Sequence, residues 1–135
     1  MRSLILTYLD SNLVTGFSVS QNLPFDQNGE ALYLQNLKSI YVDQPQTEQE
    51  PLFDTLDNSS TVAETTKINV YVVTDAKTLP TTYDTLVTTV KGVRTTSTII
   101  SLGYISRECT VSTAYANGDQ LVTTFELEFT NIINT

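Results

Sequence analysis

The chain has 135 residues, the common size of one domain with one hydrophobic core, and a formal net charge of −8 from 15 acidic and 7 basic residues. The basic residues are scattered, so the chain lacks the cluster of lysine and arginine that binding to nucleic-acid phosphates requires. The absence of histidine and the single cysteine, Cys109, exclude a histidine-assisted nucleophile, an internal disulfide and a cysteine-based structural zinc site.

The N-terminal segment predicts an amphipathic helix over Ser3–Leu13, because its apolar residues recur at helical spacing. Gly16 follows at the usual place for a C-terminal cap. The apolar run Leu4–Leu6 is too short for the core of a signal peptide or for a membrane span, so we expect a soluble intracellular protein. The first clear strand is expected at Lys38–Asp43.

The next segment, Gln44–Ser60, is expected to be a long acidic loop. It contains two prolines and no basic residue, and loops of this length in a compact domain are usually functional or disordered. Its carboxylates belong to Glu48, Glu50, Asp54 and Asp57. Asp54 and Asp57 offer oxygen ligands for calcium, but their spacing departs from that of an EF-hand loop, so we interpret them as solvated loop residues.

A long central strand is predicted from Thr61 to Thr74. Its later half places Tyr71 and Val73 on the face opposite its other valines, so both faces are expected to be buried there. A second helix is expected to follow Thr78, a favourable N-cap, with an apolar stripe that packs on the sheet.

The residues from Arg107 to Ile132 predict a long β-hairpin turned at Asn117-Gly118. The apolar residues of its returning arm alternate with a polar face that carries Glu126 and Glu128. These two carboxylates would lie about 7 Å apart, which allows a pair for glycoside hydrolysis or a site for a divalent ion. A solvated strand face is the simpler interpretation, so we expect no catalytic residue, no cofactor and no metal.

These elements together predict an α+β fold. We expect a single mixed, mainly antiparallel β-sheet packed against two helices, with the long acidic loop and the C-terminal β-hairpin. No internal repeat or second-domain boundary is visible, so residues 1–135 are expected to form one domain.

In element order the chain resembles the tail terminator proteins of tailed bacteriophages, including the minor tail protein of the lambda type. The resemblance rests on the N-terminal helix, the strand Ile40–Asp43 with its long polar loop, the strand Lys67–Val73, the helix opened by Leu79-Pro80, and two closing strands. It covers nearly the whole chain but contains no invariant motif.

The resemblance implies a structural virion protein of the tail or neck, not an enzyme, present in the host cytoplasm during assembly. Its copies would form a ring, typically a hexamer, that ends tail-tube polymerisation and provides the surface for head–tail joining. The implied partners are further copies of the chain, the tail-tube protein and the neck or head-completion proteins. DNA would pass through the ring without specific binding, and no membrane is involved.

A closed head-to-tail ring needs two unlike patches on each subunit, and we expect them at the acidic loop and the edge of the C-terminal hairpin. The carboxylates there could meet basic groups of a neighbour or form a lumen that repels DNA. The predicted interface residues are Asp43, Glu48, Glu50, Asp54, Asp57, Glu126 and Glu128.

Two other classes of function stay open. A neck or head-completion protein, or a tail-tube subunit, would also use sheets and long loops to build rings, and tube subunits stack those rings repeatedly. A carbohydrate-binding or hydrolytic β-domain would need exposed aromatic residues beside paired carboxylates, and the absence of tryptophan disfavours it.

Overall fold

The computed structural model describes residues 1–12, 17–20, 39–54, 60–75, 80–106, 109–116 and 120–134. Its helices and strands share one sheet and one hydrophobic core, so the expected α+β fold class is confirmed. The helical elements are α1 (Arg2–Asn12), α2 (Pro80–Gly92), the 3-10 turn η1 (Val93–Thr95) and α3 (Ser97–Ser101). The strands are β1 (Ser18–Ser20), β2 (Ser39–Val42), β3 (Gln46–Asp54), β4 (Ser60–Asp75), β5 (Ile105–Ser106), β6 (Thr110–Ala116) and β7 (Gln120–Asn134).

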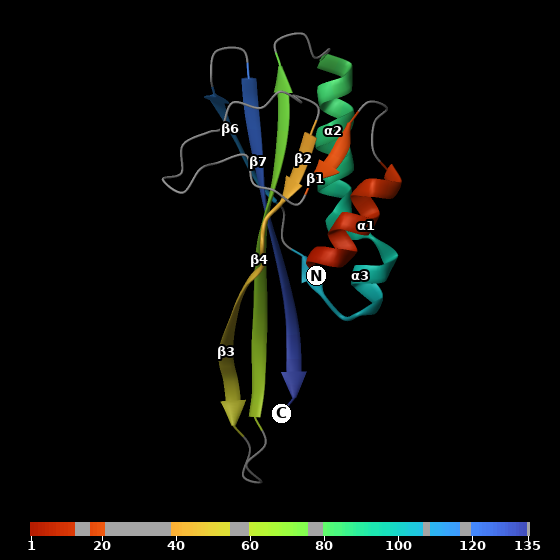
Figure 1. Cartoon of the computed structure of the whole chain (residues 1–135). Helices are drawn as coiled ribbons and strands as arrows, with labels where there is room; N and C mark the ends of the chain where they lie inside the picture. The colour runs from red at the N-terminus through yellow and green to blue at the C-terminus, as the bar shows by residue number, and fades with distance from the viewer. Residues whose placement is uncertain are drawn as a thin grey trace.

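Two long strands form the axis of the sheet. β4 and β7 pair antiparallel from Thr61 opposite Asn134 to Asp75 opposite Gln120, without a break in register (Figure 1). Towards one end of this axis, β2 and then β1 flank β4 while β6 flanks β7; towards the other end, β3 flanks β4 and the short β5 flanks β7. Only β1 and β2 pair in parallel, so the sheet is mixed and mainly antiparallel, as predicted.

The helices pack on one face of the sheet (Figure 1). Alternate residues of each long strand point to this face, as the period of two requires, and they meet the apolar stripes of the helices. The threonine-rich α2 depends on this packing, because threonine is a weak helix former. The buried core includes Ile5, Leu9, Ile68, Val70, Val72, Leu86, Val90, Val93, Phe125, Leu127 and Phe129.

The sheet is unevenly covered along its length. In the part that we call the body, residues 68–75 of β4 and 120–127 of β7 with β1, β2 and β6, the second face is buried too, at Tyr71, Val73 and Val122. This confirms the expectation that the later half of β4 is covered on both sides. The other part, which we call the arm, comprises residues 60–66 of β4, 129–134 of β7 and β3, and it extends beyond the helices (Figure 1).

One prediction was wrong, since the expected acidic loop contains a strand. Gln46–Asp54 forms β3 and pairs antiparallel with the first half of β4, with an irregularity between Pro51 and Phe53. Strand formation is possible despite the polar composition, because the edge of β4 supplies hydrogen-bond partners and leaves the side chains from Gln46 to Pro51 in water. Residues 55–59 of the expected loop lie outside the described residues.

β6 and β7 pair antiparallel where the C-terminal hairpin was predicted. The described strand begins at Thr110, later than the expected Arg107, and β7 continues to Asn134. The turn residues Asn117-Gly118 lie outside the described residues, as does Gly16. The short helix α3 was not predicted, because its five residues are too few to show a helical period.

Candidate functional site: the acidic face of the sheet

The structure brings five of the seven predicted interface residues onto one face of the sheet. In β4, Ile68 and Val70 point to the helices, so Lys67 and Asn69 point away from them. Residues directly opposite in an antiparallel pair share a face, which places Glu126 beside Asn69 and Glu128 beside Lys67. By the same register Glu48 and Glu50 of β3 lie beside Thr65 and Ala63. We call this surface the acidic face; its charged side chains are Asp43, Glu48, Glu50, Lys67, Glu126 and Glu128.

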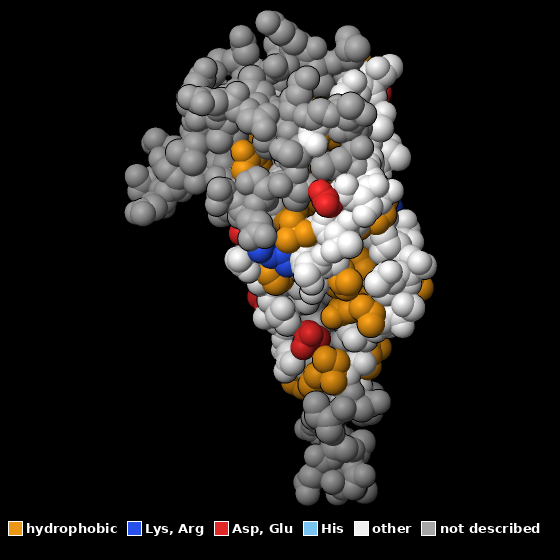
Figure 2. Space-filling model, turned by 45° about the vertical axis from the view of Figure 1, so that its right-hand side comes forward, with side chains coloured by type: hydrophobic (Ala, Val, Ile, Leu, Met, Phe, Trp, Pro, Cys, Tyr) orange, Lys and Arg blue, Asp and Glu red, His pale blue; other side chains and the backbone are white. Residues whose placement is uncertain are grey.

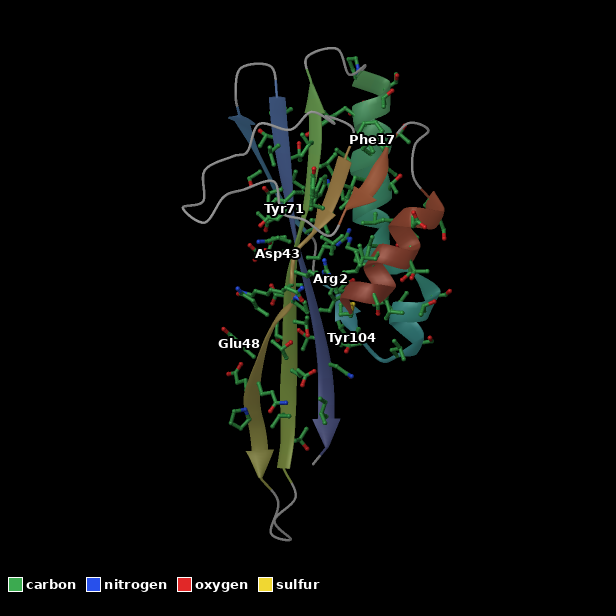
Figure 3. All side chains as sticks on the ribbon, in the orientation of Figure 1. Arg2, Phe17, Asp43, Glu48, Tyr71 and Tyr104 are labelled. Carbon is green, nitrogen blue, oxygen red and sulfur yellow. The ribbon has the colours of Figure 1, made fainter. Side chains whose placement is uncertain are left out.

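Asp43 marks the point where β2 ends and the chain turns towards β3. Its backbone N–H donates to the carbonyl of Asn69 at 2.9 Å, and its Oδ1 accepts a hydrogen bond from the backbone N–H of Gln44 at 2.7 Å. The hydroxyl of Tyr71 donates to the Oδ2 of Asp43 at 3.4 Å (Figure 3). The Asp43 carboxylate is therefore held at the junction of the body and the arm.

Tyr71 is suited to remain a neutral donor at this position. Burial raises the pKa of its hydroxyl above the ordinary value, and the nearby Asp43 carboxylate raises the pKa further, while the hydrogen bond from Asn69 acts in the opposite direction. The uncharged phenol can therefore donate to Asp43 across the whole neutral pH range.

Two shallow hollows adjoin at Lys67. The first, of about 170 Å³, is lined by Asp43, Gln44, Gln46, Lys67, Asn69 and Glu126. The second, of about 400 Å³, is lined by Glu48, Gln49, Glu50, Ala63, Thr65, Lys67 and Glu128. Among the described residues, this surface carries five carboxylates and one ammonium group, and such an excess of acidic groups attracts cations.

Among the described residues, no group of three or more histidine, cysteine or acidic side chains could hold a metal ion. The carboxylates are instead spread along the two hollows, with Glu126 exposed and Glu128 half-buried. Cys109 is buried. The described carboxylates therefore form an extended charged surface.

The remaining two predicted residues are not part of this surface as described. Asp54 belongs to β3, opposite Ser60, but its side chain is outside the described part, and Asp57 lies outside the described residues altogether. Sequence reasoning missed Lys67, the central cation of the face. Its alternation with the core residue Ile68 was a usable signal, but its neighbours across the sheet come from β3 and β7 and depend on register.

Large apolar side chains are also exposed around the base of the arm. Ile100 of α3, Leu102 after it, Ile105 of β5 and Ile132 of β7 are 58%, 53%, 64% and 55% exposed, and we call them the apolar corner. By register, Ile105 lies opposite Thr130 and Ile132 opposite Ala63, so these two side chains border the acidic face. Gly103, with a φ of 88°, turns the chain between α3 and β5 beside Asn131. Figure 2 shows hydrophobic side chains at the surface along the lower half of the molecule.

No model of a known protein family matches the chain, and no curated protein sequence matches it. None of the described helices is long and apolar enough to cross a membrane. A function for the chain therefore rests on its fold and on its two exposed surfaces.

Proposed function

We propose that this protein is a structural subunit of a tailed-bacteriophage virion, a tail terminator whose copies close into a ring, typically a hexamer. The observation that carries the proposal is that one small domain exposes clustered carboxylates on the acidic face and large apolar side chains at the apolar corner. A ring built head to tail joins one patch of each subunit to a different patch of its neighbour, so each subunit needs more than one exposed contact surface.

Burial of the apolar corner would favour association between copies of the chain. Exposed apolar groups of this size are uncommon as a cluster on a monomer and are typical of interaction sites. Each of its four side chains is more than half exposed, so covering one would contribute on the order of 1 kcal/mol. Contacts of this kind would favour assembly once copies are concentrated.

The acidic face supplies specificity. The excess of carboxylates among its described residues disfavours contact between two identical faces and favours a basic partner surface. A carboxylate-rich lumen would also let DNA pass without binding. In this function the ring acts by occupying the growing end of the tail tube and replacing it with a surface for head or neck proteins, which needs no bond-making chemistry.

The test combines native mass with electron microscopy. The purified protein should form a closed ring as concentration rises, and when added to tail-tube protein from the same phage it should shorten the tubes and sit singly at their ends. A protein that stays monomeric at every concentration and leaves tube length unchanged would overturn the proposal. Repeated stacks of rings would also overturn it, in favour of a tail-tube subunit.

A further inference from the structure

We infer that the end of β7 pairs with the same strand of a second copy of this chain, edge to edge and antiparallel, about a two-fold axis. The contact is additional to the proposed ring and does not depend on it. It rests on an open strand edge in the arm, on exposed apolar side chains beside that edge, and on the uncharged segments that meet there.

β7 has a strand partner along only part of its outer edge. On the side away from β4 it pairs with β6 and then, at Phe129 and Thr130, with β5. Gly103, with a φ of 88°, turns the chain from α3 into β5, which begins opposite Thr130. From Asn131 to Asn134 the described residues supply no strand on that side, and the end of β7 projects past α3 and β5 (Figure 1). Every second residue there directs its N–H and C=O to the open edge, where a further strand can pair with them.

The two outer edges of the arm differ in their protection against such pairing. β3 carries Glu48, Glu50 and Pro51, and charged side chains and proline are the means by which edge strands avoid pairing with other chains. The segment from Asn131 to Asn134 has neither, and its two central residues are isoleucines, which favour strands. The end of β7 is therefore the edge of the arm that is suited to accept a strand.

Apolar side chains are exposed directly beside this edge. Ile105 is 64% exposed and lies opposite Thr130, and Ile132, 55% exposed, follows two residues later on the same face of the sheet. The two isoleucines are thus diagonal neighbours at the place where a further strand would begin. Backbone groups and apolar side chains open at the same edge specify an extended strand as the occupant.

The charges around the edge favour a second copy as the source of that strand. The chain has a net charge of −8, so many contacts between copies bring like charges together. The two segments that meet at this edge, residues 95–106 and 129–134, contain no charged side chain. Glu64 lies opposite Asn131 on β4, one strand further from the edge, and its carboxylate accepts a hydrogen bond from Gln49 at 2.9 Å. Two copies can therefore meet here without direct repulsion, and each supplies the strand that the other lacks.

The two-fold axis determines the register of the pair. An axis perpendicular to the sheet keeps the acidic faces of both copies on one side, so a residue pairs only with residues that share its face. With the axis at Ile133, this residue faces its own copy and Ile132 pairs with Asn134 of the neighbour. An axis at Ile132 would instead place Asn134 at Thr130, where β5 already pairs. The arm extends beyond the helices (Figure 1), so the two bodies lie at opposite ends of the dimer. Two-fold contacts of this kind are the commonest in soluble oligomers.

A disulfide cross-link tests the register. In a Cys109→Ala background, which removes the native thiol, Ile133→Cys should form a covalent dimer in a glutathione redox buffer about tenfold faster than Ile100→Cys. The reason is that Cβ atoms of opposite residues in a strand pair are about 4.5–5.5 Å apart, close to the separation in a disulfide. Ile100 of α3 is 58% exposed, so this control measures random collisions between exposed thiols. Equal rates of cross-linking would overturn the contact.

Hydrogen exchange measured over a range of protein concentrations tests the pairing itself. In the wild-type protein the amides of residues 131–134 should become protected as the concentration rises, while those of residues 46–50 on the other edge should not change. Ile132→Lys should raise the concentration for half-protection by about tenfold, because it places a charge on the edge. The matched Ile100→Lys should stay within about twofold of wild type. Circular dichroism and thermal melts verify that both variants are folded.

The outcomes separate this contact from the proposed function. Exchange at residues 131–134 that does not depend on concentration would overturn the contact, whether or not rings form. Protection that appears only after tail-tube protein is added would also overturn it, in favour of a strand from that protein. Dimers linked at Ile133→Cys in a protein that forms no ring would remove the proposed function and leave this contact in place.

Discussion

The body and the arm contain the same two strands, β4 and β7, but are stabilised in different ways. In the body, Val70, Val72 and Phe125 pack against helices, and the opposite face is buried as well. In the arm, Val62, Ala63, Glu64 and Thr65 are only half-buried, while Thr61, Thr66 and Phe129 are buried.

The arm relies instead on its backbone ladder and on polar side-chain pairs across the strands. The hydroxyls of Thr65 and Thr130 lie 3.2 Å apart, and the amide of Gln49 donates to the Glu64 carboxylate at 2.9 Å. Such pairs contribute less than about 1 kcal/mol each. The difference indicates that the body supplies most of the folding free energy, while the arm extends the acidic face and the apolar corner into solvent.

The largest effect is expected from removing a core side chain of the body. Phe125→Ala should lower the free energy of unfolding by about 3–5 kcal/mol, because the ring is fully buried and leaves a cavity. The matched arm substitution Ile132→Ala should cost less than about 1 kcal/mol, since that side chain is 55% exposed. Urea unfolding followed by circular dichroism measures both. Equal losses would contradict the division into body and arm.

A smaller effect is expected at the turn that joins α3 to β5 beside the arm. Gly103 has a φ of 88°, so Gly103→Ala should cost about 1–2 kcal/mol through backbone strain. Gly103→Asn should cost less, because asparagine tolerates this conformation better. The comparison of the two melting temperatures is the measurement, and a Gly103→Ala protein as stable as the asparagine variant would refute the strain.

At the junction of body and arm, stability should fall at alkaline pH because of Tyr71. Its pKa is raised in the folded state, so the unfolded chain ionises first and stability falls as pH rises from about 10 through the folded pKa. Tyr71→Phe should cost about 1 kcal/mol at pH 8, where the hydrogen bond to Asp43 is lost. This loss of stability relative to the wild-type protein should become smaller above pH 10. A deficit that stays constant from pH 8 to pH 11 would argue against the raised pKa.

The smallest effect is expected within the arm. Thr65→Val removes the hydroxyl contact with Thr130 and should cost about 0.5 kcal/mol. Hydrogen exchange should show faster opening of amides in residues 60–66 and 129–134, with unchanged rates in residues 68–73. The control Thr65→Val with Thr130→Val should cost no more than the single substitutions added together. If the amides of the arm exchanged more slowly than those of the body in any variant, the body would not be the more stable of the two parts.

Much of the fold was predictable because local periodicity reports local structure. The first helix was expected at Ser3–Leu13 and lies at Arg2–Asn12, and the central strand was expected at Thr61–Thr74 and lies at Ser60–Asp75. Both segments bury one clear set of residues, so their patterns are strong. β3 has no such pattern, because both faces of its described part, Gln46 to Pro51, are exposed. Its strand conformation depends on an edge supplied by β4.

The candidate site was predictable in composition but not in geometry. The carboxylates of Asp43, Glu48, Glu50, Glu126 and Glu128 could be named from sequence, yet they belong to β3, β7 and the end of β2. Only the register of both strands on β4 aligns them around Lys67. The apolar corner had no sequence signal, because α3, the turn after it, β5 and the end of β7 meet there only after folding.

The sequence by itself therefore determined the alternation of β4 and β7, the helices that cover one face, and an acidic, histidine-free chain. These properties follow from side-chain period and composition, which act over a few residues. The tertiary structure alone decided that Gln46–Asp54 is a strand, that Glu48 and Glu50 share a face with Glu126 and Glu128, and that this face lies opposite the helices. Those outcomes depend on pairing between distant segments, where backbone hydrogen bonds and core burial outweigh local propensity.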